Sequence, residues 1–416
     1  MFSTFANAWK IKELRMRLLY MILVLAIVRL GTHIPVPGVN LEALLNAGNS
    51  DDMGTLLSLM TGGSYGTIFA MGIGPYINAS IIMQLLTVAI PKLEQISKEG
   101  EEGRKKINQY TRIAAVALAF LQGAGQVYSV RSVFTHQNFF VYAVALCAMV
   151  TGTIFIMWLG ERLTENGIGN GSSFIIFANI LSGIPNAVYS LYVEAQDSGA
   201  EGWVKIAVIL AVFALLVAFV VFVQDGERRI PVQYSRKMVG KRVFGGQSTF
   251  IPIKVNIAGV MSIIFAISLL QFPQTIYQLF GVEMLKEVVD TLSITKPVGA
   301  ILYIVLIFCF TFFYTSFAFN PVEVAENMKK SGGAIPGVRP GKPTSDYIQE
   351  IVNRVSLFGA IAYALIAMAP VVVQWLFNIN VGFGGTTLLI VTGVALEIVK
   401  QLESRLLMRH YKGFLS

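Results

Sequence analysis

The segment WVKIAVILAVFALLVAFVVFVQ (203–224) decides the fold class of this chain. Only Lys205 and Gln224 in it carry polar side chains. A helix needs about 20 consecutive, predominantly apolar residues to cross the hydrocarbon core of a bilayer. The segment therefore predicts a transmembrane helix and places the chain among membrane proteins.

Nine further apolar runs have a comparable length. They lie at 17–34, 67–90, 112–130, 139–160, 172–193, 256–272, 297–319, 354–377 and 384–403. The chain has 416 residues, of which 13% are charged, against about 25% in soluble domains. This composition excludes a soluble enzyme, a nucleic-acid-binding domain and a secreted disulfide scaffold. We predict an all-α polytopic membrane protein with ten transmembrane helices.

The basic residues predict the orientation, because short loops rich in lysine and arginine stay in the cytoplasm. If the amino terminus lies inside, 27 of the 32 lysines and arginines fall on inner segments. Both chain ends are therefore expected in the cytoplasm. Two long inner loops, 225–255 and 320–353, are basic and suggest docking of an acidic partner or of anionic lipid. Topology alone also explains a basic bias.

The residue patterns of catalysis and of ion coupling are missing from the sequence. Cys147 and Cys309 lie inside apolar runs, and the three histidines have no ligand spacing. Glu397 is the only acidic residue in the interior of a run, whereas coupled transporters need ionisable groups at membrane depth. We predict no catalytic residue, no metal site, no cofactor and no enzyme. A passive conduit is favoured over a secondary transporter of a small solute, and a purely structural scaffold is the third possibility.

Two segments differ from plain lipid-facing helices. Residues 31–66 form an outer segment without lysine or arginine, and within it 53–64 can form an amphipathic helix too short to span. That helix is either an extracellular loop helix or a re-entrant segment lining a cavity. The run at 72–86, GIGPYINASIIMQLL, contains glycines, a proline and polar residues. Such irregularity within a span indicates an internal cavity or a mobile interface.

The ten runs divide into two groups of five, in residues 1–195 and 196–416. With five spans each, the two halves have inverted orientations, a layout common in transporters and channels. No letter-by-letter repeat supports this division, so it depends on counting spans.

Eight motifs follow one another along the chain. They are IPVPGV (34–39), GIGPYINASIIMQLL (72–86), KEGEEGRKKINQYTR (98–112), MWLGERLTENGIGNG (157–171), RRIPVQYSRK (228–237), QSTFIPIKVNIAGV (247–260), FNPVEVAENMKKSGGAIPGVRPG (319–341) and FGGTTLLIV (383–391). In this order the chain resembles the SecY family, the large subunits of bacterial protein-conducting channels. The resemblance implies two five-helix halves around a central hourglass pore. It also implies a channel that conducts unfolded secretory proteins and releases membrane segments sideways into the bacterial cytoplasmic membrane.

The resemblance implies three sets of residues within the membrane. A plug at 53–64 would include Met53, Leu56, Leu57, Leu59, Met60 and Ser64. A pore ring of apolar side chains would consist of Ile73, Ile77, Ile176, Ile264 and Ile390. The family usually has a sixth apolar member where this chain has Ser172, which makes one sector of the ring less tight. A lateral gate would include Asn78, Gln84 and Asn256, for which ordinary helix packing is the alternative interpretation.

The resemblance also implies partners. The two long inner loops match the sites where the family binds its motor ATPase, SecA, and the ribosome. Their basic residues are Arg339 in IPGVRPG (335–341) and Arg228, Arg229, Arg236, Lys237, Lys241 and Arg242. Without the motif, a solvated run of charges is the ordinary explanation for them. The other implied partners are the membrane subunits SecE and SecG, preproteins with signal sequences, and membrane lipids.

Overall fold

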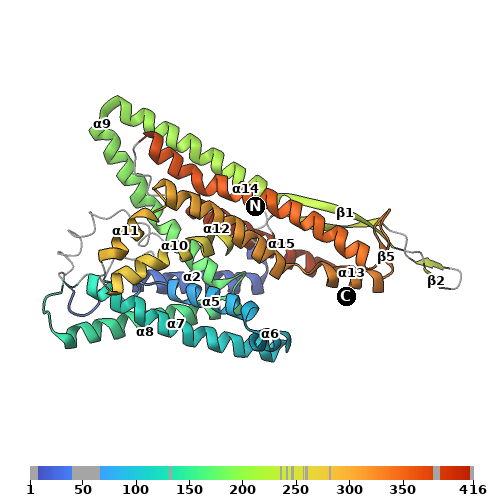
Figure 1. Cartoon of the computed structure of the whole chain (residues 1–416), viewed down its shortest axis with the longest axis horizontal. Coiled ribbons are helices and arrows are strands. Elements are labelled where there is room, and N and C mark those ends of the chain that lie inside the picture. The colour runs from blue at the N-terminus through green and yellow to red at the C-terminus, as the bar shows by residue number, and fades with distance from the viewer. Residues whose placement is uncertain are drawn as a thin grey trace. The chain divides into compact units, whose positions relative to one another are not determined.

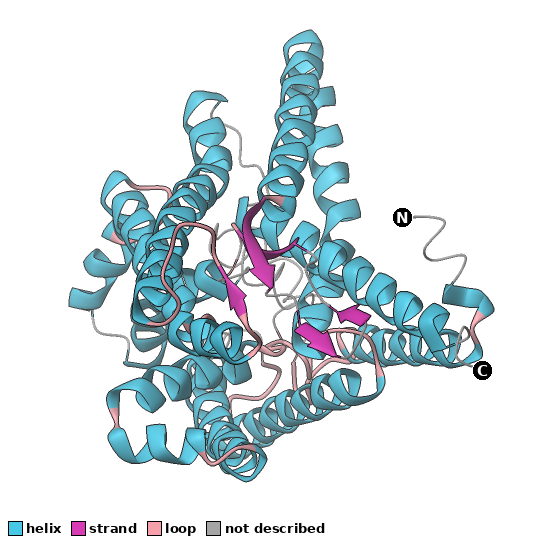
Figure 2. Ribbon diagram, turned by 90° about the vertical axis from the view of Figure 1, so that its right-hand side faces the viewer, coloured by secondary structure: helices cyan, strands magenta, loops and turns pink. Residues whose placement is uncertain are grey.

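The structure is a computed structural model that describes residues 8–39, 66–129, 131, 134–234, 237–239, 242–244, 248–255, 257, 261–280, 283–377 and 385–412. Helices make up most of these residues, and the strands are few and short (Figure 2). The chain forms two compact units. Unit 1 comprises Met1–Ile206, Ser268–Thr291 and Asn380–Ser416, and unit 2 comprises Ala207–Ile267 and Leu292–Ile379.

Unit 1 is helical. It contains α2 (Lys12–Gly31), α5 (Gly74–Ala89), α6 (Pro91–Lys98), α7 (Glu101–Ser129), α8 (Phe139–Asn166), the first part of α9 (Gly171–Asp225), the second part of α10 (Met261–Phe280), α11 (Glu283–Thr291) and α15 (Gly385–Lys412). Helices α5, α7 and α8 meet at buried Ala79, Ala115 and Met157. Between α5 and α6 the axis bends by 101°, where Pro91 has no N–H to continue the helix.

Unit 2 combines long helices with a small sheet. It contains the second part of α9, β1 (Glu227–Tyr234), β2 (Lys237–Val239), β3 (Arg242–Phe244), β4 (Ser248–Lys254), the first part of α10, α12 (Pro297–Ala318), α13 (Pro321–Lys330), β5 (Gly333–Ala334) and α14 (Lys342–Phe377). The antiparallel sheet has the order β4-β1-β5, and β2 pairs with β3. Helices α12 and α14 run side by side, and β1 and β5 lie near the α13 end of α14 (Figure 1). Between these two helices, Ser356 Oγ donates a hydrogen bond to Thr315 Oγ1 at 3.2 Å.

The all-α class is confirmed, and all ten apolar runs contain helix. Among the described residues, four segments are each long and apolar enough to span a bilayer: Phe139–Asn166, Glu201–Asp225, Pro297–Lys330 and Lys342–Trp375. The bent pair α5 and α6 makes a fifth, and Gly171–Pro185 and Met261–Gln274 are shorter apolar helices. The count of ten spans is consistent with this arrangement and stays a prediction, as does the division into halves at residue 195.

Two regions differ from what the sequence predicts. Residues 67–73 of the second predicted span are not helical: Thr67 forms an isolated β-bridge with Pro35, 68–73 form turns, and helix begins only at Gly74, with Pro75 in its first turn. The two predicted inner loops are also largely regular structure. The first carries β1 to β4, and the second carries α13, β5 and the first turns of α14.

Candidate functional site

Apart from β2 and β3, the described residues of the two predicted inner loops form one packed structure within unit 2. We call it the platform, and define it as β1, β4, α13, β5, the connecting residues 335–341 and residues 342–355 of α14. Its core consists of Ile230, Val232, Ile253, Met328, Ile335, Ile348 and Val352, each no more than 5% exposed. Along β1, buried and exposed residues alternate, so one face of the strand packs on the helices. Because an apolar core supports it, the platform presents its basic residues from a fixed backbone.

Helix α13 is held by a capped start. The side-chain oxygen of Asn320 accepts hydrogen bonds from the backbone N–H groups of Val322 (3.2 Å) and Glu323 (3.4 Å). Pro321 occupies the first turn, where the missing N–H is harmless. An asparagine cap of this kind stabilises a helix by about 1 kcal/mol relative to alanine. The sequence FNPVE therefore fixes the point where the chain leaves α12 and enters the platform.

Arg339 lies at the tip of the platform. Ile335, at one side of the tip, is buried in the core. On the other side, Thr344 Oγ1 donates a hydrogen bond to the carbonyl oxygen of Arg339 at 2.8 Å. Gly337 and Gly341 have φ values of 84° and 108°, a region that side chains with a Cβ rarely adopt. The backbone of the tip is therefore well defined, and it leaves the Arg339 side chain exposed.

The other basic residues expected for docking lie on the strands or outside the described residues. Arg228 and Arg229 are exposed on β1. Arg229 Nε lies 2.6 Å from Glu227 Oε1, and its guanidinium lies 4.8 Å from the ring centre of Phe250 on β4. The backbones of Lys237 and Arg242 belong to β2 and β3, whereas Arg236 and Lys241 lie outside the described residues.

In unit 1, Ile73 and Ser172 both lie near Gly160 of α8. A methyl group placed on Gly160 of α8 would lie 3.2 Å from Ile73 Cδ1 and 3.5 Å from both Ser172 Oγ and Ile175 Cδ1. Ile73 itself is 3% exposed. A predicted ring residue and Ser172, the position where the resemblance implies a sixth apolar member, therefore both lie next to Gly160.

The other four residues of the predicted pore ring lie on four different helices, α5, α9, α10 and α15. Ile77 is half-buried on α5, and Ile176, Ile264 and Ile390 are buried. Ile264 belongs to unit 2 and the others to unit 1, so a closed ring stays a prediction.

The polar residues of the predicted lateral gate are described only in part. Asn78 and Gln84 are half-buried on α5, where Gln84 Nε2 donates to Ser80 Oγ at 3.3 Å. Asn256 and the whole predicted plug, 53–64, lie outside the described residues.

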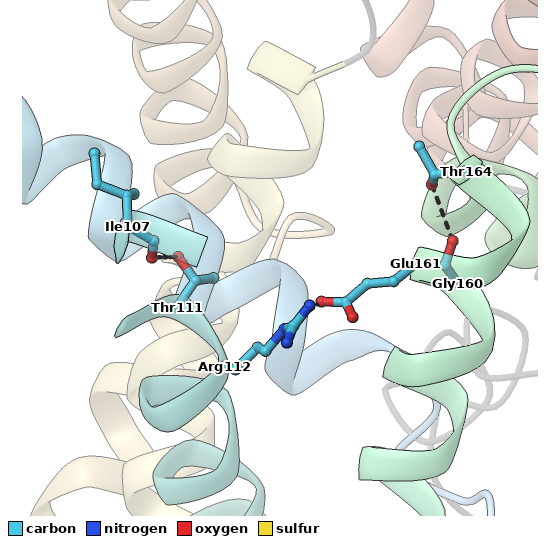
Figure 3. A network of polar contacts seen from close by, with 6 residues as sticks. All are labelled: Ile107, Thr111, Arg112, Gly160, Glu161 and Thr164. Carbon is cyan, nitrogen blue, oxygen red and sulfur yellow. Dashed lines mark hydrogen bonds and ion pairs between the residues drawn. The ribbon is translucent and has the colours of Figure 1, made fainter. Parts of the chain in front are cut away.

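An ion pair that the sequence analysis did not predict joins α7 to α8. Arg112 Nε lies 2.7 Å from Glu161 Oε1, and Figure 3 shows the guanidinium directed at the carboxylate across the gap between the helices. Each residue belongs to a different motif, 98–112 or 157–171. The only signal in the sequence was that each charge lies at the end of an apolar run, which does not specify a partner.

Reversing one charge of this pair is expected to loosen α7 from α8. Glu161→Lys would place two cations together, and we expect a loss of about 1 kcal/mol or somewhat more, because pairs this exposed contribute up to about 1 kcal/mol. Thermal unfolding of the purified protein in detergent is the measurement. Arg112→Glu in the same chain should restore most of the loss. The control is Glu165→Lys, which breaks the pair with Arg162 inside α8. An equal loss in the control would show that the pair between helices has no special role.

A match to the SecY family covers residues 67–399 of the chain. The chain belongs to the SecY family. It is 44% identical over 441 residues to the protein translocase subunit SecY of Streptomyces coelicolor and 43% identical over 438 residues to that of Streptomyces galbus. Both alignments cover 100% of each sequence. The chain is thus a multi-pass membrane protein and a subunit of a protein-conducting channel, not an enzyme. Nothing in these matches supports the solute-transporter alternative.

Solved structures confirm the SecY channel fold. One, described as showing that the SecY plug domain stabilises the closed state of the translocation channel, aligns with a TM-score of 0.68 at 19% identity and covers 92% of this chain and 91% of that chain. Another, Sec61 in a canine ribosome–channel complex, aligns with a TM-score of 0.61 at 18% identity and covers 92% and 91%. At these identities the likeness establishes the fold alone.

Proposed function

We propose that this SecY-family chain forms the pore of the protein translocase in the bacterial cytoplasmic membrane, with both chain ends in the cytoplasm. It conducts unfolded secretory proteins outward and releases transmembrane segments sideways into the lipid. The observation that carries the proposal is the identity of 43% and 44% to protein translocase subunits over their full length. The distribution of lysine and arginine supports the orientation.

The platform is the docking site for the partner that drives translocation, either the motor ATPase SecA or the ribosome. It combines a rigid core with exposed arginines at positions 228, 229 and 339. Guanidinium groups on a fixed backbone suit acidic protein surfaces and RNA phosphates. The motor ATPase SecA and the ribosome would bind here in turn, and a solved relative, Sec61, is described in a ribosome–channel complex.

The gate lies within the membrane. Ile73, Ile77, Ile176, Ile264 and Ile390 form the ring, because a narrow apolar constriction resists wetting while it stays compliant to a passing chain. Residues 53–64 act as the plug on the outer side. Asn78, Gln84 and Asn256 face the lateral seam, where hydrogen bonds of about 0.6–2 kcal/mol are weak enough to open. SecE and SecG complete the assembly in the membrane.

Reconstitution tests this function. The chain with its membrane subunits is placed in vesicles, and SecA, ATP and a radiolabelled precursor protein are added outside. We expect ATP-dependent protection of the precursor from added protease, and none in vesicles without the chain. Uptake of a small solute driven by an ion gradient, without precursor protection, would instead favour a secondary transporter.

A further inference from the structure

The turn between α8 and α9 is built around the hydroxyl group of Thr164. Thr164 Oγ1 donates a hydrogen bond to the carbonyl oxygen of Gly160 at 2.9 Å, as Figure 3 shows, and it accepts one from the backbone N–H of Gly171 at 2.9 Å. The first bond stays within α8, whereas the second reaches the first residue of α9. One hydroxyl group therefore links the end of α8 to the start of α9.

The start of α9 lies against the backbone of α8. A methyl group placed on Gly171 would collide with the carbonyl oxygen of Gly160, so only glycine permits this approach of the two helices. The side-chain oxygen of Asn170 accepts hydrogen bonds from the backbone N–H groups of Ser172 (3.0 Å) and Ser173 (3.4 Å), which caps the first turn of α9. The first turn is thus well defined, and the Thr164 hydroxyl bonds it to α8.

This first turn carries part of the predicted pore ring. Ile176 follows Ser172 by four residues, so both lie on the same face of α9. Next to Gly160, Ser172 Oγ and Ile73 Cδ1 lie 3.5 Å and 3.2 Å from a methyl group placed on that glycine. Ile73 and Ile176 are 3% and 4% exposed, and all four residues belong to unit 1. The placement of α9 on α8 therefore sets the position of Ile176 relative to Ile73.

We propose that Thr164 is a positioning residue for the pore ring. Its hydroxyl group holds the first turn of α9 on α8 and so keeps the resting channel sealed on the side of Ile176. This side depends on helix placement because Ser172, a small polar residue, occupies the position of the implied sixth apolar member. The inference rests on the proposed function, since it takes the pore ring as the seal.

Replacing Thr164 by valine tests the role of the hydroxyl group, because valine keeps the size and branching of threonine. In planar bilayers without precursor, the assembled translocase with Thr164→Val is expected to conduct ions about five-fold more than the parent. A five-fold change corresponds to about 1 kcal/mol, the net contribution of one hydrogen bond. Thr164→Ser, which keeps the hydroxyl group, should stay near the parental conductance.

Thr111→Val is the matched control. Thr111 Oγ1 donates a hydrogen bond to the carbonyl oxygen of Ile107 at 2.9 Å within α7 (Figure 3), which is the same kind of bond that Thr164 makes within α8. Both threonines lie just beyond the inner end of a predicted span, 112–130 or 139–160. Loss of the Thr111 hydroxyl group should leave the resting conductance near the parental level.

Two double variants separate positioning from a general loss of stability. In a chain with Ile176→Asn, the seal on this side is already lost, so Thr164→Val should add little to the conductance. In a chain with Ser172→Ile, the larger apolar side chain next to Gly160 should offset most of the leak caused by Thr164→Val. Independent effects on stability would instead add in both backgrounds.

Several outcomes would overturn the inference. They are parental conductance in an assembled Thr164→Val translocase, and an equal leak from Thr111→Val or from Thr164→Ser. Co-purification of the membrane subunits tests assembly, with Thr164→Ala as the second variant. If neither Thr164→Val nor Thr164→Ala assembled, Thr164 would be needed for folding and not for the seal.

Precursor export measured in vesicles with the same preparations distinguishes this inference from the proposed function. A parent that does not export precursor would contradict the proposed function. A parent that exports normally, together with a Thr164→Val channel that does not leak, would contradict only the role of Thr164.

Discussion

Replacing Arg339 by glutamate is expected to abolish motor-driven export while the protein folds, inserts and assembles normally. Arg339 is exposed, and the backbone on both sides of it is fixed by buried Ile335 and by the hydrogen bond from Thr344. Neither the platform core nor any helix depends on its charge. Losing one member of a desolvated charge pair at an interface typically costs about 2–5 kcal/mol, which corresponds to more than a ten-fold loss of productive docking.

The measurement is the SecA ATPase rate stimulated by a precursor protein in vesicles that carry each variant. Arg339→Lys should be intermediate, because the charge survives and the planar fork of donors does not. Lys330→Glu, which reverses an exposed cation at the end of α13, is the matched control and should retain most of the stimulation. If SecA ATPase stimulation in the Arg339→Glu variant equalled that of the parent, the tip would be only a solvated run of charges.

The helices were predictable from the sequence because lipid imposes a long apolar run on every span. The segment 203–224 lies within α9, and the break at Gly199 (φ 64°, ψ −139°) falls in the predicted outer loop before it. Polar helix ends were less predictable. Helix α7 begins at Glu101 and α14 at Lys342, each about eleven residues before its apolar run, because a helix continues into water without any hydropathy signal.

The platform sheet was not predicted, although a signal existed. In β1, Ile230 and Val232 alternate with exposed residues, which is the period of a strand. Pro231 weakens this strand signal, because proline argues against a strand inside a sheet. Here β5 pairs only with Gln233 and Tyr234, so Pro231 lies where β1 has β4 as its only neighbour. The structure shows why the alternation exists: Ile230 and Val232 pack in one core with residues of α13 and α14.

The gate shows a different limit. The sequence of a transmembrane helix does not show which of its isoleucines faces a pore, because isoleucines that pack against lipid or another helix are the same residue type. The structure adds that Ile73 and Ser172, which are almost a hundred positions apart in the sequence, both lie next to Gly160 of α8. No pattern within a single span contains that information.

Replacing Ile77, Ile176, Ile264 and Ile390 together by asparagine is expected to raise the ion conductance of the resting channel at least ten-fold. The closed state loses apolar contacts that the open state does not have, so the equilibrium shifts toward opening. A ten-fold change requires only about 1.4 kcal/mol. Bilayer conductance without precursor is the measurement, and export of precursors with defective signal sequences should increase in parallel.

Valine at the same four positions is the matched control, because it keeps a β-branched apolar ring and should keep the leak near the parental level. Co-purification of the membrane subunits tests folding of the asparagine variant. Ser172→Ile gives the reciprocal experiment. Ser172 Oγ and Ile73 Cδ1 approach the same point on Gly160, so a larger apolar side chain at 172 extends the contact that Ile73 already makes and should lower the resting leak. If the asparagine variant assembles normally and its resting ion conductance is no higher than that of the parent, these isoleucines only pack against neighbouring helices and do not seal the pore.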